Sequence, residues 1–260
     1  MENIFIGTSG FSYSSWHSKG SFYPPNIKTK DEFNYYSNYF NTVELNVTFY
    51  NIPKVETWQH WYEQAKNKNF LYIIKANKFF THQKKLNVDN KFKEVWKMFM
   101  KRCKILKNHL GPILFQFSNS FNLTNNNLKK LNNLGKFLPK WFYVFEFRNI
   151  TMFNDDVYKI LKNYNWCLAA INVNNWSVLP NGFTPKLIDY PLSICNWGVY
   201  IKFHGSKGQY VGNYENKILK ESAKFLNKTN LNVFAIFNNT DSNKPPSAII
   251  DALTLKKYIE

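Results

Sequence analysis

Hydrophobic and polar positions along the chain alternate between two patterns. Short runs rich in β-branched and aromatic residues predict strands, and longer stretches with apolar residues three or four positions apart predict helices. The predicted strands are residues 4–7, 42–46, 71–75, 113–117, 142–147, 167–172, 199–204 and 233–237. The predicted helices between them are residues 30–40, 55–66, 90–108, 125–137, 154–163, 215–226 and 246–258.

Regular alternation of strands and helices is typical of parallel strands joined by crossover helices. Eight such units predict an α/β fold, a single (β/α)8 or TIM barrel, with residues 1–260 as one domain. The predicted helix 90–108 carries an apolar stripe of Val95, Met98, Phe99, Cys103 and Leu106. The segment 173–197 is rich in proline and is predicted to be a long loop over the barrel mouth.

Polar residues stand where the predicted strands end, and in a barrel of this class those ends form the active-site face. Polar side chains inside apolar strands are costly unless they are bonded. The candidates for acid/base catalysis and for stabilising negative charge are Glu44, Lys75, His82, Glu146, Arg148 and His204. The candidates for ligand contact are Tyr13, Trp16, Tyr50, Gln116, Lys202, Asn238 and Asn239. We expect the strand-end residues of both sets to converge at one mouth.

The two-residue period of a strand places Glu146 and Arg148 on one face and the two intervening phenylalanines on the other. The glutamate and the arginine are then either a structural ion pair or two groups that face a ligand. His204 and Gln116 are either ligand contacts or residues bonded within the barrel wall. The aromatic candidates either pack in the core or line a ligand pocket, because tyrosine and tryptophan combine an apolar body with a polar group.

The chain is strongly basic, with a formal net charge of +17 from 34 Lys and Arg against 17 Asp and Glu. A basic surface attracts polyanions through steering and counterion release. An A+T-rich coding sequence would yield the same abundance of lysine, asparagine, isoleucine, phenylalanine and tyrosine without selection for nucleic acid. If the charge is functional, lysines and arginines should cluster around the barrel mouth.

Other features bound the compartment and the chemistry. We expect no membrane association, because no apolar run approaches the ~18 residues that span a bilayer and the first residues do not form a signal peptide. Three cysteines, Cys103, Cys167 and Cys195, without a C-x-x-C pair predict a reducing, cytoplasmic environment. Nucleophile-elbow, P-loop and H-E-x-x-H motifs are absent.

Metal chemistry is limited by the small number of suitable ligands. We predict no cofactor and no multinuclear metal centre, although one weakly held divalent ion is compatible with the sequence. We also expect the protein to fold without metal. The sequence indicates no oligomeric state.

Motifs spread along nearly the whole chain carry a family resemblance. They are Ile6-Gly7-Thr8-Ser9-Gly10-Phe11-Ser12-Tyr13 with Trp16 and Phe22-Tyr23-Pro24, Phe40-Asn41-Thr42-Val43-Glu44-Leu45-Asn46 with Thr48-Phe49-Tyr50 and Pro53, Lys75-Ala76, Thr81-His82, Leu110-Gly111-Pro112-Ile113-Leu114-Phe115-Gln116, Glu146-Phe147-Arg148, Phe203-His204-Gly205 and Phe237-Asn238-Asn239. As an ordered set they resemble the domain of unknown function 72 family, also called YecE-like. The resemblance implies a TIM barrel and no particular activity.

The chain departs from that family at three places. The family usually has arginine where Lys202 stands, tryptophan near Met152 and aspartate near Asn172. The last two departures argue against an acid or metal role at that edge of the site. The fold is also shared with sugar isomerases and apurinic endonucleases, which is an analogy of fold and not of function.

The leading hypothesis from the sequence is an enzyme, or an enzyme-like binder, that acts on a phosphate-bearing ligand, with nucleic acid favoured. Its reaction class would be that of a hydrolase or a lyase with acid/base catalysis at the barrel mouth. The first alternative is an enzyme for a phosphorylated sugar or a related metabolite. The second is a nucleic-acid-binding protein without catalysis.

Overall fold

The computed structural model describes residues 3–259, and over that range it contains nine strands and eight α-helices. The strands are β1 (Ile4–Ser9), β2 (Thr42–Leu45), β3 (Leu71–Lys75), β4 (Leu110–Gln116), β5 (Tyr143–Glu146), β6 (Cys167–Val173), β7 (Gly182–Thr184), β8 (Gly198–Phe203) and β9 (Asn232–Phe237). The helices are α1 (Glu32–Tyr36), α2 (Val47–Tyr50), α3 (Val55–Ala65), α4 (Asn90–Cys103), α5 (Asn125–Phe137), α6 (Asp155–Asn163), α7 (Asn216–Leu226) and α8 (Ser247–Ile259).

The strand order matches the predicted fold class. Within the described residues, eight strands follow the hydrogen-bonded order β1-β2-β3-β4-β5-β6-β8-β9, and β9 pairs with β1 in parallel. This is the strand order of a (β/α)8 barrel, so the predicted TIM-barrel class is confirmed. The ninth strand, β7, is antiparallel to β6.

The expectation of a structureless segment at 173–197 is wrong in part. It contains β7 and two short 3-10 turns, Leu187–Asp189 and Leu192–Ile194. Phe183 of β7 stands opposite Asn172 of β6, and its ring lies edge-on to Phe203 at 5.3 Å between centroids. A short strand forms here because β5 pairs only with the first residues of β6, which leaves the edge at Ile171 to Val173 for β7 in spite of the flanking prolines.

The predicted helix 90–108 is also corrected. α4 ends at Cys103, and a 3-10 turn follows in which Lys107 has φ of 51°. The buried stripe contains Phe99 and Cys103 as predicted, but it is completed by Trp96, whereas Met98 is exposed. The large indole sets the rotation of the helix, because it stacks on Phe115 of β4 at 5.6 Å.

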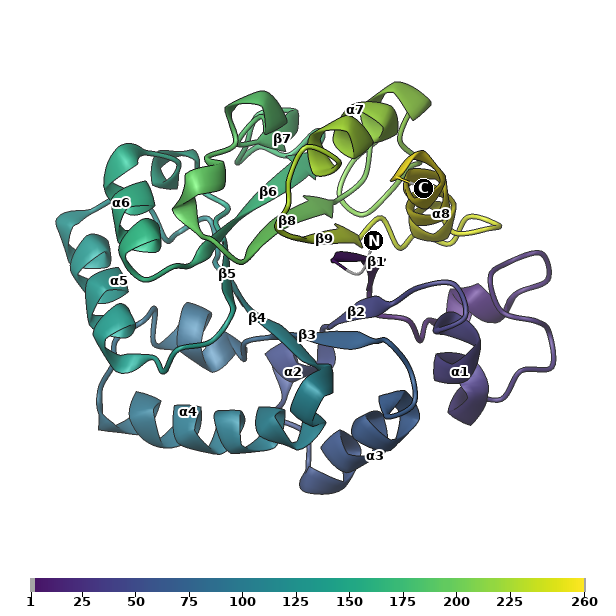
Figure 1. The fold of residues 1–260 in the computed structure, drawn as a ribbon, viewed down its shortest axis with the longest axis horizontal. Helices are drawn as coiled ribbons and strands as arrows, with labels where there is room; N and C mark the ends of the chain where they lie inside the picture. Colours follow the sequence, from purple (N-terminus) through teal and green to yellow (C-terminus); the bar gives the residue numbers. More distant parts are fainter. Residues whose placement is uncertain (1–2, 260) are drawn as a thin grey trace. The chain divides into compact units, whose positions relative to one another are not determined.

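The chain forms two compact units, and the first comprises residues 3–44, 170–190 and 198–259. In this unit β1 lies between β2 and β9, and β8 lies beyond β9. The register pairs Ser9 with Glu44 and Lys202 with Ile236, so the carboxyl ends of these parallel strands lie on the same edge. α7 and α8 pack against each other, and α8 contacts β1 and β9 (Figure 1).

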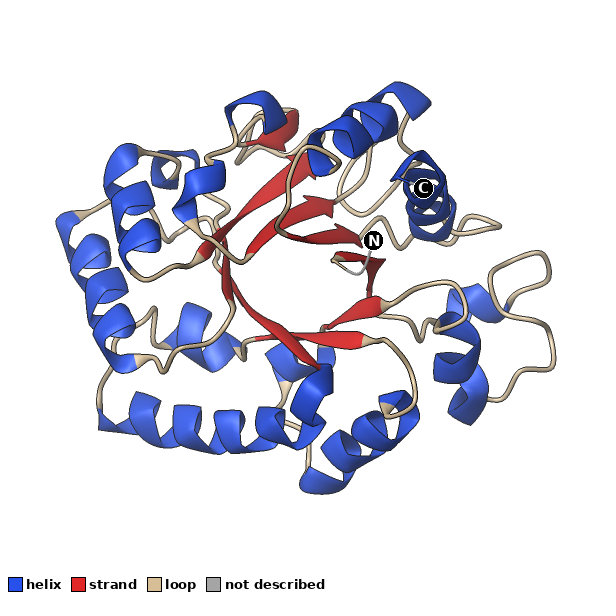
Figure 2. Ribbon diagram, viewed as in Figure 1, coloured by secondary structure: helices blue, strands red, loops and turns tan. Residues whose placement is uncertain are grey.

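The second unit comprises residues 45–169 and 191–197. Its strands β3, β4 and β5 are adjacent and parallel, and β5 also pairs with β6. Helices α3, α4, α5 and α6 lie outside these strands (Figure 2). α5 is capped at its first turn, since the Thr124 side chain accepts a hydrogen bond from the Asn127 N–H.

Candidate functional site

The second unit brings several candidate residues to one strand edge. Lys75, Gln116 and Glu146 are the last residues of the adjacent strands β3, β4 and β5. The register places Lys75 opposite Leu114, and Gln116 opposite Glu146. All three therefore lie along the carboxyl edge of one three-stranded parallel sheet. Gln116 is buried, and its amide donates to the Phe117 carbonyl at 3.4 Å.

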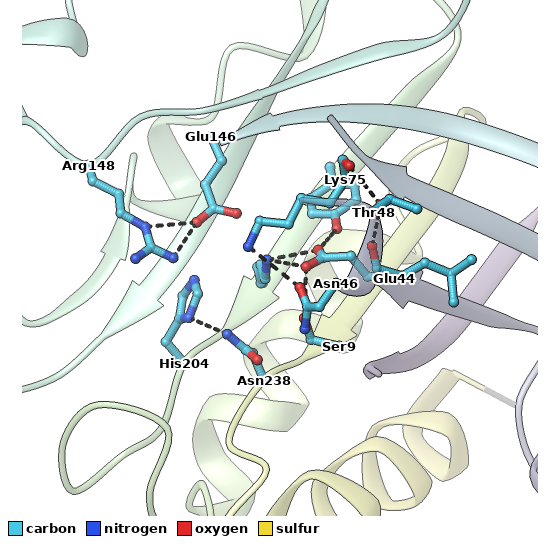
Figure 3. A network of polar contacts seen from close by, with 12 residues as sticks. Ser9, Glu44, Asn46, Thr48, Lys75, Glu146, Arg148, His204 and Asn238 are labelled. Atoms are coloured by element: carbon cyan, nitrogen blue, oxygen red, sulfur yellow. Dashed lines mark hydrogen bonds and ion pairs between the residues drawn. The ribbon is translucent and has the colours of Figure 1, made fainter. Parts of the chain in front are cut away.

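Glu146 and Arg148 form a close ion pair at the end of β5. Nε and Nη2 of Arg148 donate to Oε1 of Glu146 at 3.1 and 2.9 Å (Figure 3). The carboxylate is fully buried, whereas the arginine side chain is 14% exposed. The alternation predicted for this strand is confirmed, because Phe145 points the other way and stacks on Trp166 at 4.4 Å.

The ammonium group of Lys75 is positioned by the short helix α2. Its Nζ lies 3.5 Å from Oδ1 of Asn46 and 4.6 Å from the centroid of the Phe49 ring. The Thr48 hydroxyl donates to the Lys75 carbonyl at 2.7 Å and fixes α2 against the end of β3 (Figure 3). The sequence prediction did not include Phe49, although its place beside Tyr50 after a strand end was a signal for it.

His82 lies in a π-helical turn, Phe79–Gln83, that follows β3. Its Nδ1 shares a 2.8 Å hydrogen bond with the Thr81 hydroxyl, and its ring stands edge-on to Phe49 at 5.1 Å. Burial lowers the pKa of His82, and the charges of Lys75, Arg148 and Lys78 lower that pKa further. The imidazole is therefore neutral near pH 7, in a place where positive charge gathers.

In the first unit, Glu44 is the centre of a buried network. Lys202 bonds its carboxylate at 2.8 Å, the Ser9 hydroxyl donates to Oε1 at 2.7 Å, and the Tyr200 hydroxyl donates to Oε2 at 2.6 Å. Both charged side chains are almost completely buried. Such saturation fits a structural ion pair better than a general base, since a base needs an oxygen that can take a proton.

His204 and the asparagines after β9 form a second polar group in this unit. Nδ1 of His204 lies 3.1 Å from Nδ2 of Asn238 (Figure 3). Asn239 is buried, and its amide donates to the Gly212 carbonyl at 3.0 Å and to Asp251 at 2.6 Å. Burial raises the pKa of Asp251 to about 6. The sequence prediction missed Asp251, although it is the one acidic residue in the largely apolar helix α8.

Three aromatic candidates differ in exposure. Trp16 is completely buried and packs on Tyr13 with 4.8 Å between ring centroids. The Tyr13 hydroxyl donates to the Ser9 carbonyl. Tyr50 is 61% exposed, and Nζ of Lys78 lies 5.8 Å from its ring centroid. Of the three, only Tyr50 offers a largely open face for stacking, whereas Trp16 is a packing residue in this structure.

The predicted residues are thus divided between the two units. The second unit holds Tyr50, Lys75, His82, Gln116, Glu146 and Arg148, and the first holds Tyr13, Trp16, Glu44, Lys202, His204, Asn238 and Asn239. The convergence of both sets at one mouth stays a prediction. Over residues 3–259, no group of three or more His, Cys, Asp or Glu side chains is arranged to hold a metal ion. No helix in that range is long and apolar enough to cross a membrane.

Solved structures confirm the barrel class. A DUF72 family protein from Thermotoga maritima MSB8 is 25% identical, with a TM-score of 0.79 and coverage of 98% of both chains. A DUF72 family protein from Enterococcus faecalis V583 is 20% identical, also with a TM-score of 0.79, and covers 98% of this chain and 95% of that chain. The D-psicose 3-epimerase of Clostridium cellulolyticum H10, at 9% identity and a TM-score of 0.54, covers 98% of both chains and shares the fold.

The protein is therefore an α/β barrel with polar groups gathered at strand ends. Residues 5–260 match the model of the family described as protein of unknown function DUF72, and the chain belongs to that family. The UPF0759 protein YunF of Bacillus subtilis (strain 168) is 24% identical over 262 residues, which cover 91% of this chain and 88% of that protein.

Proposed function

We propose that the protein is an acid/base enzyme, or an enzyme-like binder, for a phosphate-bearing ligand, with nucleic acid as the favoured class. The observation that carries the proposal is the gathering of cations around His82 in the second unit. Lys75 Nζ and the His82 ring lie 4.6 and 5.1 Å from the centroid of the same Phe49 ring. Burial lowers the pKa of His82, and the charges of Lys75, Arg148 and Lys78 lower that pKa further. A group of cations around a neutral proton donor is suited to an oxyanion, which takes both the charge and the hydrogen bonds.

The groups of the second unit divide naturally into roles. Lys75 and Arg148 hold the anion and stabilise negative charge that develops on it. Glu146 is the general base, because it is the carboxylate at the carboxyl end of β5, beside the partly exposed Arg148. His82 is the proton donor, because its neutral ring carries the proton on Nε2 when Thr81 donates to Nδ1. Glu44 is the weaker choice of base, because the buried Lys202 already neutralises it.

Lysines interleaved with aromatic rings favour nucleic acid as the ligand class. Beside the Lys75–Phe49 pair, Lys78 lies 5.8 Å from the Tyr50 ring. Lys75 is the last residue of β3, and the other three residues follow the ends of β2 and β3. Aromatic faces stack on bases and neighbouring lysines neutralise phosphates, which is how single strands are bound without sequence preference.

The burial of Trp16 and Glu146 favours a second candidate function. A site whose catalytic carboxylate, Glu146, is completely buried suits a small substrate. Because Trp16 is also buried, it offers no surface for stacking on a base, although the sequence predicted such a contact. That candidate is an enzyme for a phosphorylated sugar or a related metabolite, which would use the same proton-transfer groups.

The two candidates are separated by the imidazole signals of His82 in nuclear magnetic resonance spectra. We expect a 5′-phosphorylated single-stranded oligonucleotide to shift the His82 signals at micromolar concentration, and a pentose phosphate to do so only at millimolar concentration. Arg148→Ala should weaken the response, while Lys129→Ala, an exposed lysine on α5, should not. The reverse order of ligands would support the metabolite enzyme, and no response to either would contradict the proposed function.

A further inference from the structure

The segment between β1 and α1 brings together a histidine and a buried carboxylate that are fifteen residues apart in sequence. His17 ends a 3-10 turn, Ser14–His17, and Glu32 is the first residue of α1. Nε2 of His17 lies 2.8 Å from Oε1 of Glu32, whose side chain is only 3% exposed. Neither residue belongs to the groups described above.

The imidazole of His17 is held in one orientation. Its Nε2 contacts the Glu32 carboxylate. The face of the ring lies against Tyr23, with 5.0 Å between ring centroids and an interplanar angle of 31°. Tyr23 is itself buried, and its hydroxyl donates to the Phe11 carbonyl at 2.6 Å. A histidine oriented by a carboxylate in this way presents its second nitrogen to whatever lies beyond it.

An open cavity of about 610 Å³ lies beside this pair. It is lined by Ser12, Tyr13, Ser14, His17, Ile27, Lys28, Thr29 and Glu32. In the described part of the chain, the hydroxyls of Ser12, Ser14 and Thr29 make no hydrogen bond, and Lys28 makes no ion pair. The cavity thus contains several polar groups that the fold itself does not use.

These polar groups are mainly donors. A protonated His17 donates one N–H to Glu32 and has a second N–H for a ligand, and Lys28 adds a full positive charge. The Glu32 carboxylate also lines the cavity, and its charge is balanced by the protonated imidazole of His17, whose Nε2 lies 2.8 Å from Oε1. Hydroxyls, an ammonium and an imidazolium together match the acceptor oxygens of a tetrahedral oxyanion.

We infer that this cavity is an oxyanion subsite, in which His17, Lys28 and the three hydroxyls hold a phosphate group. The inference deepens the proposed function and rests on it, because it assigns the same ligand class, a phosphate-bearing one, to a cavity of the first unit. Glu32 is a positioning residue that holds the imidazole toward the cavity. Tyr13, a predicted ligand contact, lines the same cavity and forms part of its wall.

The test uses inorganic phosphate as the probe, with binding measured by calorimetry at pH 6 on the full chain. We expect Lys28→Ala and His17→Gln each to weaken binding about tenfold, because each removes a charge-assisted hydrogen bond. The matched control is Lys30→Ala, which removes an exposed lysine two residues away that does not line the cavity. Lys28 is also exposed, so its replacement should leave the melting temperature unchanged.

A second measurement isolates the role of His17. Sulfate is a second tetrahedral oxyanion, and we expect His17→Gln to weaken sulfate binding about tenfold, as for phosphate. Glu32→Gln should shift the imidazole signals of His17 in nuclear magnetic resonance spectra, because the ring is then less well held. Glu32→Asp should not restore those signals, because the shorter side chain withdraws the carboxylate from Nε2.

Each outcome decides between the two proposals. The subsite is supported if Lys28→Ala and His17→Gln weaken phosphate binding while Arg148→Ala does not. The proposed function is contradicted if, in addition, the His82 signals respond to neither the oligonucleotide nor the pentose phosphate. If Lys28→Ala and Lys30→Ala behave alike, or if the cavity binds Mg²⁺ or an organic amine instead, the oxyanion subsite is overturned. In that case a His82 response to the oligonucleotide would still support the proposed function.

Discussion

At the residue scale, side-chain spacing within one strand was readable from the sequence, but pairing between distant strands was not. Glu146 and Arg148 are two positions apart, so strand periodicity alone places them on one face, and the structure adds their ion pair. Lys202 was predicted as a ligand contact from its place near the end of a strand, and nothing in its local sequence indicates Glu44 as its partner. Their contact depends on where β2 and β8 lie in the fold, which local patterns do not encode.

The buried Lys202–Glu44 pair leads to a prediction about stability. Lys202→Met keeps most of the side-chain volume but leaves the Glu44 carboxylate buried without its cation, so we expect the free energy of unfolding to fall by roughly 3–5 kcal/mol. Adding Glu44→Gln should recover most of the loss, because the unpaired charge is then removed. Urea denaturation measures both variants. If Lys202→Met alone were as stable as the double variant, the Glu44 carboxylate would not be stabilised by Lys202.

Asp251 leads to a prediction about pH. Burial raises the pKa of Asp251 to about 6, above its ordinary value of 3.8, so folding favours the protonated carboxyl. Its contribution to stability is therefore complete below about pH 4 and is lost as the pH rises through 6. The unfolding free energy of the wild type, relative to Asp251→Asn, should decrease by on the order of 3 kcal/mol from pH 4 to above pH 6. An increase over this range would contradict the assignment.

At the element scale, the sequence predicted which elements exist more reliably than where they end. Every predicted strand is present, because runs of buried β-branched and aromatic residues depend only on local pattern. The C-terminal end of α4 and the presence of β7 were missed for tertiary reasons. Lys107 adopts a left-handed conformation that its residue type does not favour, and β7 forms only because β6 offers an edge.

The loop after β8 supports a prediction about a single glycine. Gly205 has φ of +116°, and a methyl group there would lie 2.5 Å from the carbonyl oxygens of Gly208 and Val211. Gly205→Ala should therefore cost at least about 2 kcal/mol more than the control Gly20→Ala. Gly20 also has positive φ, but no atom lies within 4 Å of such a methyl group, so only backbone strain is added.

The same variant tests whether this loop positions His204. The Gly205 N–H donates to the Tyr214 hydroxyl at 2.9 Å, and the Tyr210 N–H donates to the His204 carbonyl at 2.6 Å. If the loop holds His204 in place, the imidazole signals of His204 should shift in Gly205→Ala and not in Gly20→Ala. If Gly205→Ala and Gly20→Ala lost equal stability and the His204 signals did not change, the backbone around residue 205 would have moved to accommodate the methyl group without displacing His204.

At the scale of the whole molecule, the fold class followed from sequence pattern, whereas the ligand did not. Eight strand–helix alternations restrict the topology strongly, because parallel strands need crossover helices. The net charge of +17 does not choose a partner, since an excess of lysine and arginine attracts any polyanion. A strongly basic chain is expected both from selection for nucleic-acid binding and from an A+T-rich coding sequence.

The salt dependence of oligonucleotide binding tests the central claim most directly, namely that cations at the strand ends of the second unit hold a phosphate. For a single-stranded oligonucleotide, each neutralised phosphate contributes about −0.7 to the slope of log affinity against log salt. We predict that Arg148→Ala makes the slope shallower by about this amount and weakens binding several-fold, while Lys129→Ala changes neither. Equal losses from Arg148→Ala and Lys129→Ala would show that only bulk charge acts, and would contradict the claim.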